Sequence, residues 1–251
     1  MSREMEWSSE EFDLGNWRTW QTWQLASFWV IAVLGQEVLQ QFLVFLGRFA
    51  FKRIPETGKP LEKFGPKDWF FVCFNRFSVP LMTYHLLSFV SNNRNHIEWD
   101  LEKLSYRNSV GSVVAYFALY DILYVPFHGI LHMRGIYKYI HKHHHRNAAP
   151  FRGNIDASNT HPVEFLVGEY LHLLVVYIVP GHVLAVAFFL IFGGLLASMN
   201  HTRLDLSIPG IFNVRAHDKH HHMPQSNYGQ YTMFVDKLIG TFQGKSACKV
   251  A

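Results

Sequence analysis

Histidine clusters beside long apolar stretches are the feature that most constrains how this chain can fold. The first cluster is an H-x-x-x-H pair, and two later clusters share the spacing H-x-x-H-H. In chain order the clustered residues are His128 and His132, then His141, His144 and His145, then His217, His220 and His221. Residues three and four apart share one face of a helix, so each cluster could aim two or three imidazoles at one point.

The number of histidines predicts two metal ions. Imidazole is a good ligand for iron, zinc, copper or nickel, and eight imidazoles exceed what one tetrahedral zinc can use. The two cysteines, Cys73 and Cys248, lie far apart in unlike contexts, so the ligands must be histidine, carboxylate or water. A single H-x-x-x-H could be a chance pair, and a His-rich tract could be a solvated tail. Such tracts are usually terminal and polar, whereas these clusters flank apolar segments.

Five apolar stretches predict an all-α integral membrane protein with about four to five apolar helices. The chain is 49% hydrophobic and only 17% charged, below the roughly 25% charged residues of soluble domains. The stretches lie at about 25–51, 69–90, 110–127, 163–179 and 182–199. The last two are short for a membrane span and are separated by Pro180-Gly181, which indicates a hairpin.

The distribution of charge predicts one arrangement of these stretches. If the first three each cross the membrane, residues 52–67 lie on the same side as His128, and the hairpin starts and ends on that side. The Lys and Arg residues there match the excess of basic residues in cytoplasmic loops. They include Lys52, Arg53, Lys59, Lys63, Lys67, Arg134, Lys138, Lys142, Arg146 and Arg152. We therefore expect a His-rich cap on the cytoplasmic face. The net charge of +4 is too small to argue for a nucleic-acid partner.

The N-terminal arm is polar and acidic over its first 22 residues. We see no basic start followed by a compact apolar run, so no cleaved signal peptide is expected. The arm is rich in tryptophan, which could sit at a membrane interface or pack on the protein itself. These residues are Trp7, Trp17, Trp20 and Trp23.

Several polar residues interrupt the apolar stretches. Those of the first stretch are expected to face other helices rather than lipid, and they are Gln36, Glu37, Gln40 and Gln41. Asp121, two helical turns before His128, could orient a metal ligand or form a helix–helix hydrogen bond. His85 is expected to be a satisfied interior group.

The histidine segments and the residues after them resemble the sterol desaturase and fatty acid hydroxylase superfamily, over roughly residues 110–242. The matching segments are HGILH (128–132), YKYIHKHHH (137–145), HPVE (161–164), NH (200–201) and the block 217–242. The last block is the most specific, because its H-x-x-H-H is followed by Asn227, Tyr228, Gly229, Asp236, Gly240 and Thr241, as in C-5 sterol desaturases. Gly129 departs from the Arg of many members, and His143 and His222 are extra histidines.

The resemblance implies an integral membrane oxygenase with two Fe ions that uses O2 to hydroxylate or desaturate a sterol or other lipid. It adds His161 and His201 as single further ligands. It also implies a separate electron donor, such as cytochrome b5 or a reductase, and location in the endoplasmic reticulum. The domains expected are 1–109 (arm and first two membrane helices), 110–242 (catalytic) and 243–251 (tail).

Two other classes of function stay open at this point. A zinc-dependent membrane hydrolase would need a general base, for which Glu164 or Glu169 are candidates. A metal carrier or transporter would spread ionisable residues through its membrane spans, whereas most histidines here cluster outside the apolar stretches. The residues do not choose between hydroxylation and desaturation.

Overall fold

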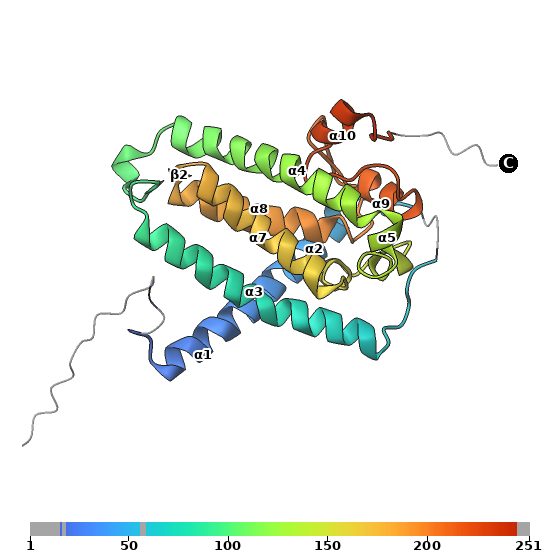
Figure 1. Ribbon diagram of the computed structural model, residues 1–251, viewed down its shortest axis with the longest axis horizontal. Helices are drawn as coiled ribbons and strands as arrows, with labels where there is room; N and C mark the ends of the chain where they lie inside the picture. Colours follow the sequence, from blue (N-terminus) through green and yellow to red (C-terminus); the bar gives the residue numbers. More distant parts are fainter. Residues whose placement is uncertain (1–15, 17–18, 56–58, 245–251) are drawn as a thin grey trace, which may run out of the picture.

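The computed structural model describes residues 16, 19–55 and 59–244 (Figure 1). The protein is mostly helical (65%). Its longer elements are α1 (Thr22–Val30), η2 (Ile31–Gly35), α2 (Gln36–Ala50), α3 (Pro66–Asn92), η4 (Arg107–Gly111), α4 (Ser112–Leu131), α7 (Pro162–Ile178), α8 (Val183–Met199) and α9 (Val214–His222). The short ones are β1 (Ile97–Glu98), η3 (Leu101–Lys103), α5 (Arg134–Tyr137), η5 (His144–Arg146), α6 (Asn154–Ala157), β2 (Gly181–His182), β3 (Ser207–Ile208), β4 (Phe212–Asn213) and α10 (Phe234–Ile239).

Each predicted apolar stretch is helical over its described length except for one end residue at most, namely residue 51, 179 or 182. Elements α1, η2 and α2 form one helix of 29 residues, and η4 continues into α4 as one helix of 25 residues. These two are long and apolar enough to cross a membrane, and α8 is a shorter apolar helix. The helical character predicted from the sequence is therefore confirmed.

Helix α4 packs against both α7 and α8 (Figure 1), and all three contribute buried residues to the core. Tyr116 of α4, Val175 of α7 and Phe189 of α8 are fully buried there. Helix α3 packs along α7, and α2 packs against α8. The end of α4 and the start of α7 lie at the same end of the bundle as α5 and α9, so the long helices deliver their terminal residues to one place.

The opposite end of the bundle is closed by a two-stranded parallel pairing of β1 with β2. Ile97 pairs with Gly181, and the backbone there packs directly on α4. A Cβ at Gly181 would clash with the Tyr116 hydroxyl and crowd Ser112, which explains why glycine occupies this turn.

A buried arginine ties two distant segments together near α9. Arg203 has a φ of 59° and is 1% exposed. Its guanidinium donates to the carbonyls of Ile54 and Pro55 and lies 3.2 Å from Asp218 Oδ1. The connection between α2 and α3 is thereby held against α9.

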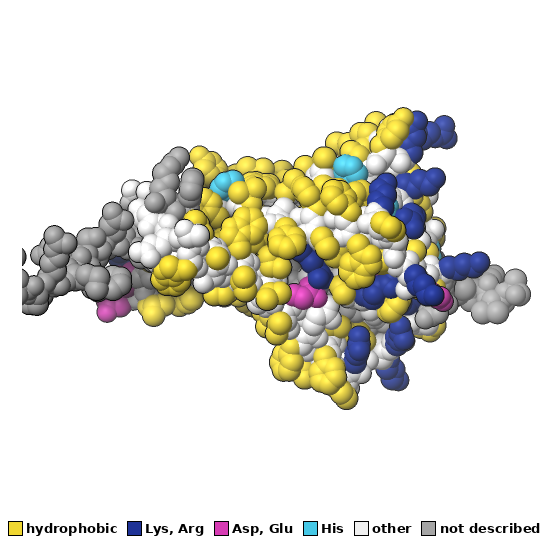
Figure 2. All heavy atoms as spheres, turned by 90° about the horizontal axis from the view of Figure 1, so that it is seen from below, with side chains coloured by type: hydrophobic (Ala, Val, Ile, Leu, Met, Phe, Trp, Pro, Cys, Tyr) yellow, Lys and Arg dark blue, Asp and Glu magenta, His cyan; other side chains and the backbone are white. Residues whose placement is uncertain are grey.

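The surface separates into an apolar body and a basic end. Figure 2 shows hydrophobic side chains over the body and Lys and Arg side chains gathered at one end. The exposed apolar residues include Phe42, Phe49, Phe77, Val114 and Ile122. Large exposed apolar surfaces mark contact with a membrane or a partner. This apolar surface, like the two long apolar helices, indicates a membrane protein.

Two tryptophans of the N-terminal arm lie among the described residues and differ in burial. Trp20 is buried and contacts Phe28 and Tyr84 edge-on, whereas Trp23 is 64% exposed. Trp7 and Trp17 lie outside the described residues.

Candidate metal centre

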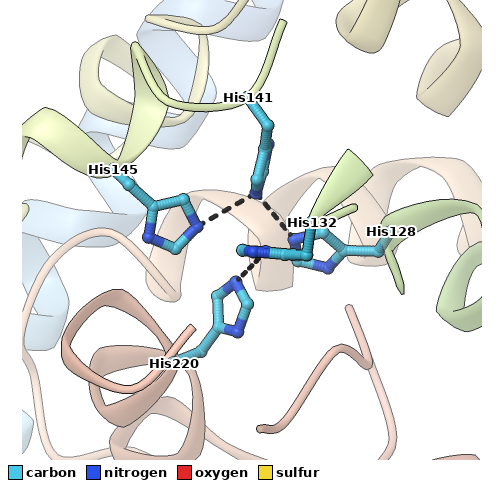
Figure 3. Close-up of side chains that lie close together, drawn as sticks. All are labelled: His128, His132, His141, His145 and His220. Atoms are coloured by element: carbon cyan, nitrogen blue, oxygen red, sulfur yellow. Dashed lines mark hydrogen bonds between the residues drawn. The ribbon is translucent and has the colours of Figure 1, made fainter. Parts of the chain in front are cut away.

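Nine imidazoles gather in two groups at the basic end of the bundle. The first group comprises His128, His132, His141, His145 and His220. The second group comprises His144, His201, His217 and His221. Within each group one ligand nitrogen per residue lies within 4.8 Å of all the others. Figure 3 shows the imidazoles of the first group converging, with Nε2 pairs 3.0–3.3 Å apart.

The two H-x-x-H-H clusters are each divided between the groups. His141 and His145 join the first group and His144 the second, whereas His217 and His221 join the second and His220 the first. Each H-x-x-H-H cluster thus aims two of its imidazoles at one group, within the two or three that the spacing predicted. In both clusters the pair four residues apart stays together and the middle histidine crosses to the other group.

Geometry explains this division. On α9, residues 217 and 221 are about 40° apart around the helix axis, whereas residue 220 lies about 60° to the other side of residue 217. The segment that carries His141 and His144 is not a regular α-helix, because α5 ends at Tyr137 and turns lead into the short helix η5. The two clusters nevertheless divide in the same way.

Hydrogen bonds to Nδ1 fix several of these rings in the first group. His128 Nδ1 lies 2.8 Å from the Tyr228 carbonyl oxygen, and His220 Nδ1 lies 2.6 Å from that of Ser226. His141 Nδ1 lies 2.8 Å from Glu164 Oε1. These acceptors require the proton on Nδ1 and leave the Nε2 lone pair directed into the group, as metal-binding histidines need.

Burial keeps these imidazoles neutral, which is the form that binds metal. Loss of solvation lowers the pKa of His144 to about 3 and that of His201 to about 4. The pKa values of His217 and His220 also fall well below the ordinary value, for the same reason. A set of buried, neutral nitrogen donors with their lone pairs converging fits divalent iron, and zinc or copper as well.

The segment after α9 supports the first group through a hydrogen-bonded loop. Asp236 accepts from the backbone N–H groups of Tyr228 (2.8 Å) and Gly229 (2.7 Å), and from the Thr241 hydroxyl (2.6 Å). Asn227, with a φ of 56°, donates to the Ala216 carbonyl. The loop therefore places the Tyr228 carbonyl against His128, which gives the N-Y-G, Asp and Thr residues a structural role.

His161 is placed apart from both groups. Its Nδ1 accepts from the backbone N–H of Val163 (3.2 Å), so the ring caps the start of α7. His201 is brought into the second group, with Nδ1 2.9 Å from the Ala197 carbonyl. Of the two further ligands implied by the resemblance, His201 therefore belongs to a histidine group and His161 does not.

The extra histidines of the two clusters contact carboxylates instead. His143 Nε2 lies 3.0 Å from Asn159 Oδ1 and 3.0 Å from Asp68. His222 lies 3.9 Å from Asp218. Neither ring belongs to either histidine group.

Asp121 and His85 have other partners than a metal ligand. Asp121 accepts from three successive backbone N–H groups of residues 230–232. Asp121 therefore anchors the loop at residues 230–232. The sequence had predicted that Asp121 orients a metal ligand or forms a helix–helix hydrogen bond. His85 Nδ1 pairs with the Tyr170 hydroxyl at 2.8 Å, so the ring has a partner, but it is exposed and the prediction of an interior position is wrong.

Two cavities lie within the bundle, and the inner one adjoins the histidine groups. The inner cavity, about 130 Å³, is lined by His128, His144 and Glu164 among others. The apolar cavity, about 470 Å³, lies between α2, α3 and α8. Sequence reasoning considered Glu164 only as a hydrolytic base and missed it as the partner of His141. Its position in H-P-V-E, between two histidine segments, was the available signal.

Comparisons with known proteins agree with this site. A model of the fatty acid hydroxylase family matches residues 113–241. The chain is 33% identical over 133 residues to fatty acid hydroxylase ahd1 of Mycosarcoma maydis, covering 52% of this chain and 34% of that protein. It is 28% identical over 233 residues to methylsterol monooxygenase 1 of Rattus norvegicus, covering 84% of this chain and 77% of the relative. It is 30% identical over 148 residues to lathosterol oxidase of the same species, covering 54% and 46%.

The extent of these matches differs. The chain spans about a third of the length of the fungal hydroxylase and about three quarters of the rat methylsterol monooxygenase. No solved structure matches the chain. The family match ends at residue 241 and includes all nine grouped histidines.

Proposed function

Because the chain belongs to the sterol desaturase and fatty acid hydroxylase superfamily, we propose that it is a membrane-bound oxygenase that uses O2 and two Fe ions to hydroxylate or desaturate a lipid. The observation that carries the proposal is the convergence of nine Nε2 donors in two adjacent groups. Iron bound there would supply O2 activation and the removal of hydrogen from an unactivated C–H bond.

The proposed ligands are the nine histidines of the two groups. His161, which the resemblance also implied, is left out of the proposed set because its Nδ1 is engaged in capping α7. Among the described residues, the cysteine Cys73 is exposed on α3 and belongs to neither group. An all-nitrogen donor set of this size is suited to iron and exceeds the four ligands of structural zinc.

The chain's own groups hold the centre in its binding form. Glu164 and the Tyr228 and Ser226 carbonyls keep protons on Nδ1 of their histidine partners. Most of the grouped histidines are buried, whereas His132 and His145 are half-buried, so burial limits the access of bulk water to the centre. Together these groups fix ligand orientation and protect a reactive site, which is the protein's contribution to such chemistry.

The hydrolase alternative is less well supported. Glu164, the nearest candidate for its general base, already accepts a hydrogen bond from His141 at 2.8 Å. The relatives reported above are named as hydroxylase, monooxygenase and oxidase. We therefore favour oxidation over hydrolysis.

We also propose the membrane arrangement expected from the sequence. The apolar helices would lie in the bilayer, four to five in number with α7 and α8 as a hairpin, and the histidine groups would face the cytoplasm. The basic end shown in Figure 2 supports this orientation. The endoplasmic reticulum is the proposed membrane. Residues 110–242 would form the catalytic domain, preceded by 1–109 and followed by the tail 243–251.

The basic end also suits a separate electron donor. Exposed side chains beside the histidine groups include Arg134, Lys138, Lys142 and Arg146. Complementary charge steers an acidic partner to such a face. We propose a donor of the cytochrome b5 type or a similar reductase.

The test is metal analysis combined with product analysis. The full chain, purified in detergent, should contain about two irons per molecule, as nine clustered imidazoles would hold. Lipids from a host that expresses the chain under ¹⁸O₂ should gain a labelled hydroxyl or a new double bond, compared with a host expressing the His220→Ala variant. One tightly held zinc with no iron after anaerobic iron loading, together with unchanged lipids, would refute the proposal.

A further inference from the structure

The inner cavity and the apolar cavity meet at a ring of shared residues. Six residues line both cavities, namely Gln36, Gln40, Val79, Glu169, His172 and Gly194. On the side toward the histidines the lining is rich in polar groups. On the other side it is formed by aliphatic residues such as Leu39, Leu86 and Val186. A molecule that fills both cavities would therefore pass from apolar to polar surroundings at this ring.

Gln40 is the most unusual member of the ring. It is 5% exposed, and among the described residues its Oε1 has no hydrogen-bond partner. A buried amide oxygen without a partner is costly and calls for an explanation. Since Gln40 lines both cavities, a ligand that donates a hydrogen bond there would satisfy it.

Gly194 of α8 leaves space opposite this amide. A Cβ at this position would lie 3.2 Å from Gln40 Nε2 and 3.7 Å from Gln36 Nε2. Glycine at this position therefore leaves room for the Gln36 and Gln40 amide groups where the two cavities adjoin.

The charges at the ring disfavour a carboxylate ligand. Arg76 is the only Lys or Arg among the residues that line either cavity, and its Nη2 lies 2.7 Å from Glu37 Oε2. Glu169 lines both cavities. An anionic head group would meet three acidic side chains, Glu37, Glu164 and Glu169, and one guanidinium that is already paired. A neutral hydroxyl group meets no such repulsion and can donate to Gln40.

We propose that Gln40 is a specificity-determining residue that accepts a hydrogen bond from the hydroxyl group of a neutral lipid alcohol. The hydrocarbon body of this alcohol fills the apolar cavity, so its hydroxyl end faces the histidine groups. The inference rests on the proposed function for the identity of the site, and it names the class of substrate. A hydroxysterol and a long-chain alcohol share this chemistry.

Direct binding tests the inference without turnover. Full-length protein in detergent is immobilised, and binding of tritiated cholestanol and tritiated hexadecanol is measured in competition with cholestane, hexadecane and palmitate. One alcohol or the other should bind about 3–10-fold more tightly than its hydrocarbon, as one net hydrogen bond allows. The stronger of the two arms identifies the source of the hydroxyl. Palmitate should compete less well than hexadecanol.

The matched variants are Gln40→Leu and Gln41→Leu. Gln41 is the next residue of α2, lines neither cavity, and donates instead to Glu37 Oε1 at 2.9 Å. Gln40→Leu should remove the preference for alcohol over hydrocarbon, and Gln41→Leu should keep it. Gly194→Ala should weaken binding of both alcohols by narrowing the passage.

The inference is overturned if the wild-type protein binds alcohol and hydrocarbon equally, or if palmitate competes best. It is also overturned if Gln40→Leu keeps the full preference. The wild-type comparison stands even if a variant fails to fold. Since binding needs neither O2 nor an electron donor, failure here is distinguishable from failure of the oxygenase proposal, which is judged by iron content and lipid products.

Discussion

The two histidine groups differ in how their rings are held. In the first group, Nδ1 of His128, His141 and His220 each has a partner, and only His145 has a buried Nδ1 without one in the described part of the chain. In the second group, Nδ1 of both His217 and His221 is buried without a partner there. The other two rings of the second group have backbone partners, since His201 Nδ1 lies near the Ala197 carbonyl and His144 has a backbone hydrogen bond with Asn159.

This difference concerns preorganisation. A ring whose Nδ1 is already hydrogen-bonded loses less freedom when Nε2 binds a metal, and its basicity is raised by the partner. The first group should therefore bind its metal more tightly than the second. The following experiments test whether the two groups differ in how firmly they hold a metal.

The largest effect is expected from removing a ligand of the better-held group. His220→Ala should lower activity more than about 100-fold, beyond the loss typical of a ligand's supporting partner, because no neighbouring imidazole can replace its donor. Iron content and turnover are measured in the same preparation. His222→Ala on the same helix is the control and should change both little, since this ring lies near Asp218. Equal losses in the two variants would contradict the assigned register.

A smaller effect is expected from loosening one ring of the first group. Glu164→Ala should lower metal affinity or activity about 10–100-fold, because His141 loses the partner of its Nδ1. Glu164→Gln keeps an acceptor oxygen and should recover part of the loss. The exposed Glu62→Ala serves as control. A Gln variant as poor as the Ala variant would indicate that the charge of Glu164 itself matters.

A chelator should remove iron from the two groups at different rates. We expect iron to leave in two phases, the faster from the second group, with rates that differ by about tenfold if outer hydrogen bonds contribute as they do elsewhere. Iron released to a chelator is followed in wild-type protein and in Glu164→Ala, where the two phases should approach each other. A single phase in the wild type would show that the groups do not differ.

The smallest effect is expected at His161. His161→Gln should change iron content by less than about threefold, while the lost cap lowers the free energy of unfolding by about 1 kcal/mol. His201→Gln, in the second group, should lower iron content clearly. Iron content and thermal unfolding are measured side by side. A loss of iron in His161→Gln that matched His201→Gln would place His161 among the ligands.

Sequence spacing singled out most of the histidines that the structure brings together, but it did not predict how they divide between the two groups. The repeated H-x-x-H-H identified six of the nine grouped residues, because ligand spacing is local. Which group each residue joins depends on how the segment after α5 turns and how α9 lies against it. That packing is tertiary and cannot be read from spacing alone.

The end of a helix is also hard to predict from the sequence. The apolar stretch predicted to end at residue 127 continues as α4 to Leu131, through Pro126. Proline usually interrupts a helix, yet here packing carries the helix onward and puts His128 on it. For Gln40 the signal was present, since a polar residue in an apolar stretch was expected to face other helices. Only the cavities show what it faces.

The division of the clusters also has a consequence for the folding of the chain. His132 and His220 are 88 residues apart, and His144 and His201 are 57 apart, yet each pair shares a group. A metal ion held by such a pair is a crosslink that closes a long loop of the unfolded chain, and a crosslink over loops of this size removes about 4 kcal/mol of chain entropy. Metal-binding free energy then becomes folding free energy. Iron supply would set how long each molecule survives proteolysis as well as how fast it works.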